Sequence, residues 1–248
     1  MLFFRYYLWF APYLLCGAAL LCAIRNRVHR RLPAFMNLLG YFFFFDLPAT
    51  VIVGLVFPVS VYRWLTVVDS TATFLLEVLV LYELSTELLL SQLVKREMRP
   101  IPRWIAAILL LIATCLAAFL PQSAQYEARN IFHILDFGFN LAVIGFLVSM
   151  ALLTRIIGIS WRGTPAGIAL GFGVVAAAEM MASPIMAYMG QSSYIDADIL
   201  RMIAFHVCAV IWLIYVLLPE VPRHLGEPSV RLADIELRMQ ELQRIVRK

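Results

Sequence analysis

Charged residues are scarce in this chain of 248 residues: they make up 15% of it, whereas hydrophobic residues make up 62%. Soluble globular domains carry about 25% charged residues. The mean hydropathy of +0.85 is also strongly apolar. This balance excludes an ordinary soluble domain and indicates an integral membrane protein, with little of the chain left over for a domain outside the bilayer.

Lysine is nearly absent, and its absence excludes one class of membrane protein. Lys95 and Lys248 are the only lysines, and neither falls in an apolar stretch. A retinal chromophore needs an intramembrane lysine for its Schiff base, so a light-driven rhodopsin is excluded. Haem is not expected either, because the candidate axial ligands His133 and His206 differ by ~10 Å in predicted depth.

Other motifs are missing as well. The four cysteines lie in apolar stretches and form no CxxC motif, so they indicate small buried side chains and no disulfide framework. No GxxxxGK[ST] motif is present, and a nucleotide site is therefore not expected. The formal charge of +4 is explained by membrane orientation, and nucleic acid is not expected as a partner.

Seven apolar stretches approach or exceed the roughly 20 residues that a helix needs to cross the membrane. They are residues 6–24, 35–57, 67–90, 104–120, 131–153, 166–188 and 199–218. The sequence therefore predicts an all-α, polytopic membrane protein, with a seven-transmembrane helix bundle over residues 1–220. Residues 221–248 are predicted to form a separate cytoplasmic amphipathic C-terminal helix.

Basic residues indicate the orientation of this bundle. They follow the odd-numbered stretches, as in Arg25 to Arg31, Lys95 to Arg103, Arg155 with Arg162, and six more beyond residue 220. Because cytoplasmic loops are enriched in lysine and arginine, the N-terminus is predicted outside and the C-terminus in the cytoplasm. No N-x-S/T sequon occurs, which agrees with a multi-pass protein of a bacterial inner membrane.

The C-terminal segment carries a hydrophobic seam. Leu232, Ile235, Met239, Leu242 and Val246 step by three and four residues, which is an a/d pattern, over fewer than three heptads. Two interpretations stay open. The helix lies on the cytoplasmic membrane face or under the bundle, or it docks onto a partner protein or a second copy.

Polar side chains from five stretches are predicted to share one depth. With the middle of each stretch taken as the bilayer centre, Asp46 lies at the centre, and four others lie within roughly 3 Å of it. Ionisable groups in hydrocarbon are costly unless they face the bundle interior, pair or line water. We therefore expect a polar midplane cluster that binds a small ligand or ion. Glu83, a further acid on the third stretch, is added to the five residues that share this depth. The predicted ligand-binding residues are Asp46, Glu77, Glu83, Asn140, Glu179 and His206.

Two features predict how the helices around this cluster are shaped. Pro48 lies two residues after Asp46 and predicts a kink in the second stretch, because proline removes a helical hydrogen bond. Gly167 and Gly171 form a small-xxx-small motif in the sixth stretch. That motif predicts close packing of the sixth stretch against a neighbouring helix.

Several functions remain compatible with the polar cluster. A receptor-like protein would bind its ligand there and signal to a partner. A metal-dependent hydrolase would use a divalent metal, with ligands drawn from His133, Asp136, Glu179 and His206, although no HxxxH or HExxH motif reinforces them. An ion or proton pathway would use the same carboxylates. An accessory subunit of a larger complex would not need these carboxylates. Buried polar groups can also serve only as interhelical hydrogen bonds.

Three segments resemble a known group of proteins. "LVLYEL" (79–84), "WRGTPAGIALGFG" (161–173) followed by Glu179, and "HVCAVIWLIYVLLPE" (206–220) are similar to small seven-helix membrane proteins of the acidobacterial type. The likeness covers about half of the chain. A more distant likeness is to the seven-helix sensor modules of bacterial histidine kinases. The resemblance implies no activity, only that Tyr82, Glu83, Trp161, Arg162 and Glu179 matter.

Overall fold

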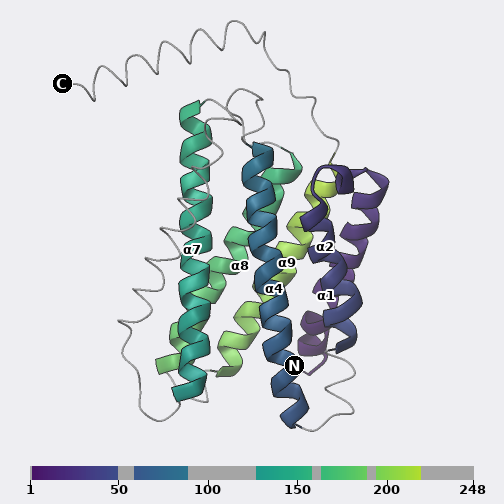
Figure 1. Ribbon diagram of the computed structural model, residues 1–248. Helices are drawn as coiled ribbons and strands as arrows, with labels where there is room; N and C mark the ends of the chain where they lie inside the picture. The colour runs from purple at the N-terminus through teal and green to yellow at the C-terminus, as the bar shows by residue number, and fades with distance from the viewer. Residues whose placement is uncertain (1, 50–58, 89–126, 158–162, 189–193, 219–248) are drawn as a thin grey trace, which may run out of the picture.

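The computed structural model describes residues 2–49, 59–88, 127–157, 163–188 and 194–218, and this part of the chain is helical with no strand. The predicted all-α class is confirmed. The predicted fourth span and the C-terminal helix over 221–248 lie outside the described residues. The elements are α1 (Leu2–Arg25), η1 (Val28–Arg30), α2 (Pro33–Tyr41), η2 (Phe42–Asp46), α4 (Val59–Leu88), α7 (Glu127–Ile157), α8 (Thr164–Tyr188) and α9 (Tyr194–Leu217) (Figure 1).

Three of the described helices are long and apolar enough to cross a membrane. They are the segments Tyr7–Arg25 of α1, Thr164–Ala182 of α8 and Ile195–Leu217 of α9. A shorter apolar segment, Phe137–Leu152, lies in α7. The chain is therefore a helical membrane protein. Helix α4 is longer than any of the three segments, but it carries acids along its length and is not among them.

Helices α8 and α9 pack closely, as the glycine motif predicts. A Cβ atom added at Gly167 would collide with the ring of Tyr215, and one added at Gly171 would collide with Trp212. The Trp212 indole Nε1–H donates to the carbonyl of Ile168 at 3.3 Å, so the two helices also share a hydrogen bond. Glycine at these positions lets the backbone of α8 approach the large side chains of α9.

The remaining described helices surround this pair. Helix α1 packs against α9 and α2, α7 packs against α8, and α4 packs against α2 and α8. Buried side chains of all six α-helices belong to one core cluster. At its centre Phe35 of α2 meets Trp212 edge to face, with ring centroids 5.4 Å apart.

The irregularity predicted at Pro48 takes the form of a π-helical turn over Phe42–Asp46. The N–H of Leu47 donates to the carbonyl of Phe42, five residues earlier. Pro48 has no N–H and cannot continue the ordinary ladder to the carbonyl of residue 44. Single π turns inside helices are rare and often mark functional positions. Asp46 is the last residue of this one.

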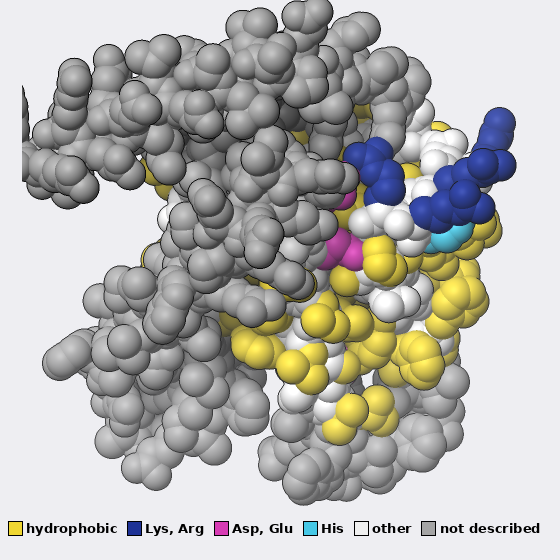
Figure 2. All heavy atoms as spheres, turned by 45° about the horizontal axis from the view of Figure 1, so that its top comes forward, with side chains coloured by type: hydrophobic (Ala, Val, Ile, Leu, Met, Phe, Trp, Pro, Cys, Tyr) yellow, Lys and Arg dark blue, Asp and Glu magenta, His cyan; other side chains and the backbone are white. Residues whose placement is uncertain are grey.

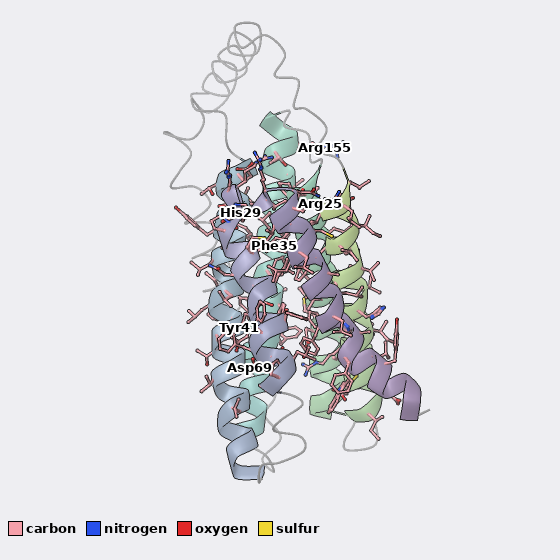
Figure 3. The ribbon with its side chains drawn as sticks, turned by 90° about the vertical axis from the view of Figure 1, so that its right-hand side faces the viewer. Arg25, His29, Phe35, Tyr41, Asp69 and Arg155 are labelled. Atoms are coloured by element: carbon pink, nitrogen blue, oxygen red, sulfur yellow. The ribbon has the colours of Figure 1, made fainter. Side chains whose placement is uncertain are left out.

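Several helix ends meet at one end of the molecule, which we call the basic end. The Asn26 side chain, just after α1, donates to the carbonyl of Val216 near the end of α9 at 2.7 Å. Arg31, just before α2, contacts Glu87 near the end of α4. Figure 3 shows Arg25, His29 and Arg155 together toward this end, with Tyr41 and Asp69 further along the bundle. Arg25, His29 and Arg155 therefore lie at the same end of the molecule.

Candidate functional site

The centre of the candidate site is a group of side chains around two buried cysteines. Cys16 of α1 and Cys208 of α9 are fully buried and lie within electrostatic range of each other. The Asp46 carboxylate lies within electrostatic range of Cys16, and the Glu77 carboxylate lies within range of Cys208. Residues of α1, η2, α4 and α9 thus bring two of the predicted acids toward one interior region.

Tyr41 extends this group toward a third acid. Its hydroxyl donates to Oδ1 of Asp69 at 2.6 Å and lies within electrostatic range of Asp46. The bond joins the last residue of α2 to α4, so it fixes the π turn against its neighbour. Tyr41 was not among the predicted site residues, because an aromatic residue beside four phenylalanines gives no sign of a polar contact.

Asn140 is buried in α7, with 6% of its surface exposed. Its neighbour Phe139 lies against Phe74 of α4, with ring centroids 4.5 Å apart. Phe74 precedes Glu77 by one helical turn. The predicted common depth of Asn140 and Glu77 therefore agrees with the contact between their helices. A buried amide is costly unless it is hydrogen-bonded, so Asn140 belongs to the polar interior of the bundle.

Glu179 of α8 pairs with Arg201 of α9. The Arg201 Nη2 and Glu179 Oε2 atoms are 2.5 Å apart, and about a fifth of each side chain is exposed. An acid in the interior of a membrane bundle is costly unless it is paired with a cation or protonated. For Glu179 the chain itself supplies the cation. Arg201 lies 22 residues after Glu179 in the sequence. The rotation of α8 and α9 about their own axes brings the two side chains together.

His206 lies beside Tyr7, with ring centroids 5.5 Å apart, so it joins α9 to the first turns of α1. Its Nδ1 atom is buried and has no hydrogen-bond partner among the described residues. A buried imidazole nitrogen without a partner is costly in a protein interior. It is therefore well placed to form a hydrogen bond with a bound molecule or water.

The metal prediction named four ligands, and two of them have described side chains. Glu179 and His206 lie on the neighbouring helices α8 and α9, whereas His133 and Asp136 lie in α7 with side chains outside the described set. Among the described residues, no group of three or more histidine, cysteine or acidic side chains could hold a metal ion. The metal site over all four residues stays a prediction.

Glu83 contacts backbone rather than other side chains. Its two carboxylate oxygens accept hydrogen bonds from the N–H groups of Ala34 and Phe35, each at 3.0 Å. These are two of the N–H groups that the first turn of α2 leaves without intrahelical acceptors. Leu32, at the cap position, cannot accept them with its side chain. Glu83 therefore caps α2 from a different helix.

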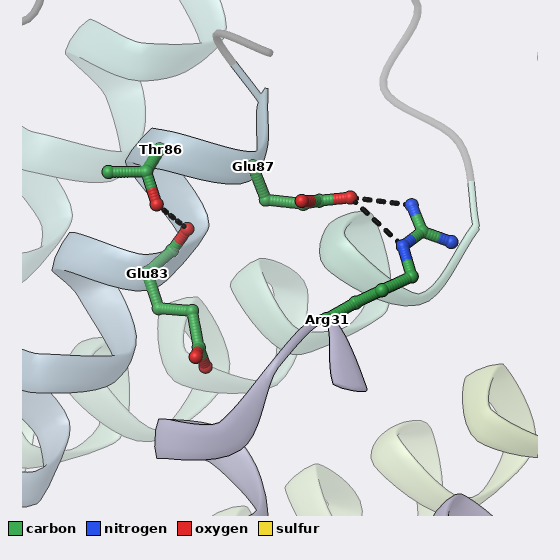
Figure 4. A network of polar contacts seen from close by, with 4 residues as sticks. All are labelled: Arg31, Glu83, Thr86 and Glu87. Atoms are coloured by element: carbon green, nitrogen blue, oxygen red, sulfur yellow. Dashed lines mark hydrogen bonds and ion pairs between the residues drawn. The ribbon is translucent and has the colours of Figure 1, made fainter. Parts of the chain in front are cut away.

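One turn further along α4, Glu87 binds Arg31. The Arg31 Nη2 and Nε atoms lie 2.5 Å and 3.2 Å from Glu87 Oε1 (Figure 4). Figure 4 also shows Thr86 beside Glu83; the Thr86 hydroxyl donates to the Glu83 carbonyl at 2.8 Å. Glu83 and Glu87 together hold the start of α2 against α4. Sequence periodicity places both on one side of α4 but cannot show that their partners are backbone groups and an arginine of another segment.

The chain has no match among protein-family models, curated proteins or solved structures.

Proposed function

We propose that this chain is a sensory, receptor-like protein of a bacterial inner membrane, with seven transmembrane helices, an outer N-terminus and a cytoplasmic C-terminus. A small ligand or ion binds among the polar side chains of the bundle interior. The resulting change passes to a partner protein through residues 221–248. The resemblance to seven-helix sensor modules points in the same direction.

The observation that carries this proposal is the position of α9. This helix bears Arg201, His206 and Cys208, each of which contacts or lies near a polar or aromatic group of another helix. Its last turn receives the hydrogen bond from Asn26. The chain then runs directly from α9 into the C-terminal segment. A displacement of α9 along or about its axis would therefore reach residues 221–248.

The seven-span topology also requires α4 and α7 to cross the membrane. Helix α4 has 30 residues and α7 has 31, which corresponds to about 45 Å of helix and exceeds a ~30 Å hydrocarbon core. The acids of α4 count against a lipid-exposed span, but Asp69, Glu83 and Glu87 bond with α2 or the segment before it. Charges that are satisfied inside a bundle are compatible with a membrane span.

The pair of Glu179 and Arg201 provides a two-state element. A ligand carboxylate or phosphate would compete with Glu179 for the guanidinium, and a cationic ligand would compete with Arg201 for the carboxylate. Either ligand would favour the arrangement of α8 and α9 in which the pair is open, and a ligand shifts an equilibrium only by such differential binding. His206 Nδ1 offers a further contact on the same helix.

The proposal is tested in two parts. The purified protein in nanodiscs is analysed by native mass spectrometry for a retained non-lipid molecule, and the same is done with Glu179→Gln and Arg201→Gln. Asp196→Asn is the matched control, because Asp196 is exposed in the first turn of α9. We expect a retained molecule that both interior variants lose and the control keeps. Retention that is absent, or equal in all variants, rejects the ligand site.

The second part addresses signalling. A variant lacking residues 229–248 keeps the bundle and loses the proposed output segment. We expect it to lose the recovery of a partner by photo-crosslinking in native membranes, while the retained molecule is unaffected. Unchanged recovery of the same partner would reject the signalling role without touching the ligand site.

A proton or ion pathway is a second candidate, favoured by a different observation. Asp69, Tyr41, Asp46, the two buried cysteines and Glu77 follow one another at hydrogen-bonding or electrostatic range. Linked titratable groups in the interior of a membrane bundle are typical of proton relays. Flux in liposomes that depends on Glu77 would support it. Flux that is absent, or that persists in Glu77→Gln, would reject it.

A further inference from the structure

The connection between α1 and α2 concentrates positive charge on the surface. Arg25, Arg27, His29 and Arg30 are all exposed, whereas Val28 between them is buried. We call residues 25–30 the basic turn. Within the described part of the chain, no carboxylate pairs with these arginines, and the nearby Glu87 is bound to Arg31. Their charges are therefore available to a ligand from outside.

The basic turn is held in a defined shape. Val28 fills the core from inside the turn, and Asn26 ties it to the end of α9. On the other side, Arg31 ties it to α4. Arg27 adopts the left-handed conformation, with φ 55° and ψ 25°, which is uncommon for a residue other than glycine. Because the turn is fixed on both sides, its backbone loses little further freedom on binding.

An apolar surface leads up to the basic turn. Leu14, Leu21 and Ile24 of α1 are exposed, with half or more of each side chain accessible, and Ile24 directly precedes Arg25. Figure 2 shows the arginine and histidine side chains at the top of the described surface, above a broad area of hydrophobic side chains. A membrane-spanning helix places such a stripe against acyl chains.

We propose that the basic turn, together with the apolar stripe of α1 below it, is a binding site for an anionic phospholipid. The arginines would hold the headgroup phosphate, and one acyl chain would lie along Leu14, Leu21 and Ile24. Continuity between the charged and apolar surfaces favours a lipid over a soluble phosphate compound, which would use only the turn. This inference concerns the surface of the bundle and does not depend on the ligand of the polar interior.

The test compares lipids retained by the full-length protein after release from nanodiscs of mixed phosphatidylcholine and phosphatidylglycerol, by native mass spectrometry. A hydrogen bond from one arginine to the headgroup phosphate is worth about a five-fold difference in association, which Arg155 on the far side of the bundle would not contribute. We expect phosphatidylglycerol to be enriched on the wild type. The double variant Arg27→Gln/Arg30→Gln should retain it about 30-fold less tightly, and Arg27→Lys/Arg30→Lys should recover part of the binding.

Arg155 provides the matched control, because it is an exposed arginine at the same end but on α7, across the bundle from α1 (Figures 1 and 3). Arg155→Gln should leave the retention unchanged. An equal loss in Arg155→Gln would show only general attraction to the anionic surface and overturn the proposal. The proposal would also be overturned if free glycerol phosphate displaced the bound phosphatidylglycerol as effectively as added phosphatidylglycerol does. The circular dichroism spectrum of each variant checks that the helices are intact.

Discussion

Removing the carboxylate of Glu83 should loosen the start of α2. In Glu83→Ala the N–H groups of Ala34 and Phe35 lose their acceptor, and Phe35 is fully buried, so water cannot easily replace it. A lost cap costs about 0.5–2 kcal/mol, and each buried donor without a partner costs about 1–3 kcal/mol. We expect Glu83→Ala to lower the free energy of unfolding by about 3 kcal/mol.

Glu83→Gln should cost less, because one amide oxygen remains as an acceptor. Its loss has two sources: one of the two N–H groups loses its acceptor, and the charge, which interacts with the positive end of α2 and is worth about 0.3–1 kcal/mol, is removed. The matched control is Glu87→Gln, one turn away. Its partner Arg31 is 40% exposed, and ion pairs open to solvent contribute about 0–1 kcal/mol.

The assay is equilibrium unfolding by SDS in mixed micelles, followed by tryptophan fluorescence. The reasoning predicts the order Glu83→Ala, then Glu83→Gln, then Glu87→Gln, from the most to the least destabilised. If Glu83→Ala unfolds within about 0.5 kcal/mol of the wild type, a difference typical of neutral surface changes, then Glu83 does not cap α2. That result would return Glu83 to the set of residues available for a ligand.

Three further predictions use the same unfolding assay. Gly171→Ala should lower the free energy of unfolding by about 2 kcal/mol, because the added methyl group overpacks against α9. Gly173→Ala is the control and should be neutral or stabilising, because its Cβ would lie 3.9 Å from the nearest side chain. Equal effects of the two substitutions would contradict the close approach of α8 and α9. Arg201→Gln should lower the free energy of unfolding by about 2 kcal/mol, because it leaves Glu179 without its cation. The double variant Arg201→Gln/Glu179→Gln should recover part of this loss. Losses that simply add would show that the two side chains do not interact. Tyr41→Phe should cost about 1–2 kcal/mol, and no loss would mean that its hydroxyl is not needed by Asp69.

Helix boundaries were largely predictable because apolar length and helix breakers are local properties. The predicted stretch 166–188 corresponds to Thr164–Tyr188, and 199–218 corresponds to Tyr194–Leu217. The glycine motif correctly predicted the close contact of α8 with a neighbour. Among the described helix starts, the largest shift is in α4, which begins at Val59, eight residues before the predicted start, because Arg63 makes its first turns too polar to be counted as part of a span.

The partners of the polar side chains were not predictable in the same way. Glu83 was assigned to a ligand, and the structure shows it bonded to the backbone of α2. Asp46 was assigned to the interior and lies near a buried cysteine. Depth along a helix follows from counting residues, whereas the direction of a side chain depends on the rotation of each helix, which is set by packing. Sequence alone therefore predicts which residues share a layer but not which of them touch.

The orientation of Asp46 and Glu77 toward the protein interior, and not toward the acyl chains, underlies the proposed ligand site. It is tested with a spin label attached at one of these two positions at a time, in a variant without native cysteines. The collision rate of each label with oxygen is then measured in lipid bilayers. Phe44 and Leu75 are the controls, since 63% and 55% of their surfaces are exposed. We expect low oxygen accessibility at Asp46 and Glu77 and high accessibility at both controls. Equal accessibility at all four positions would contradict it.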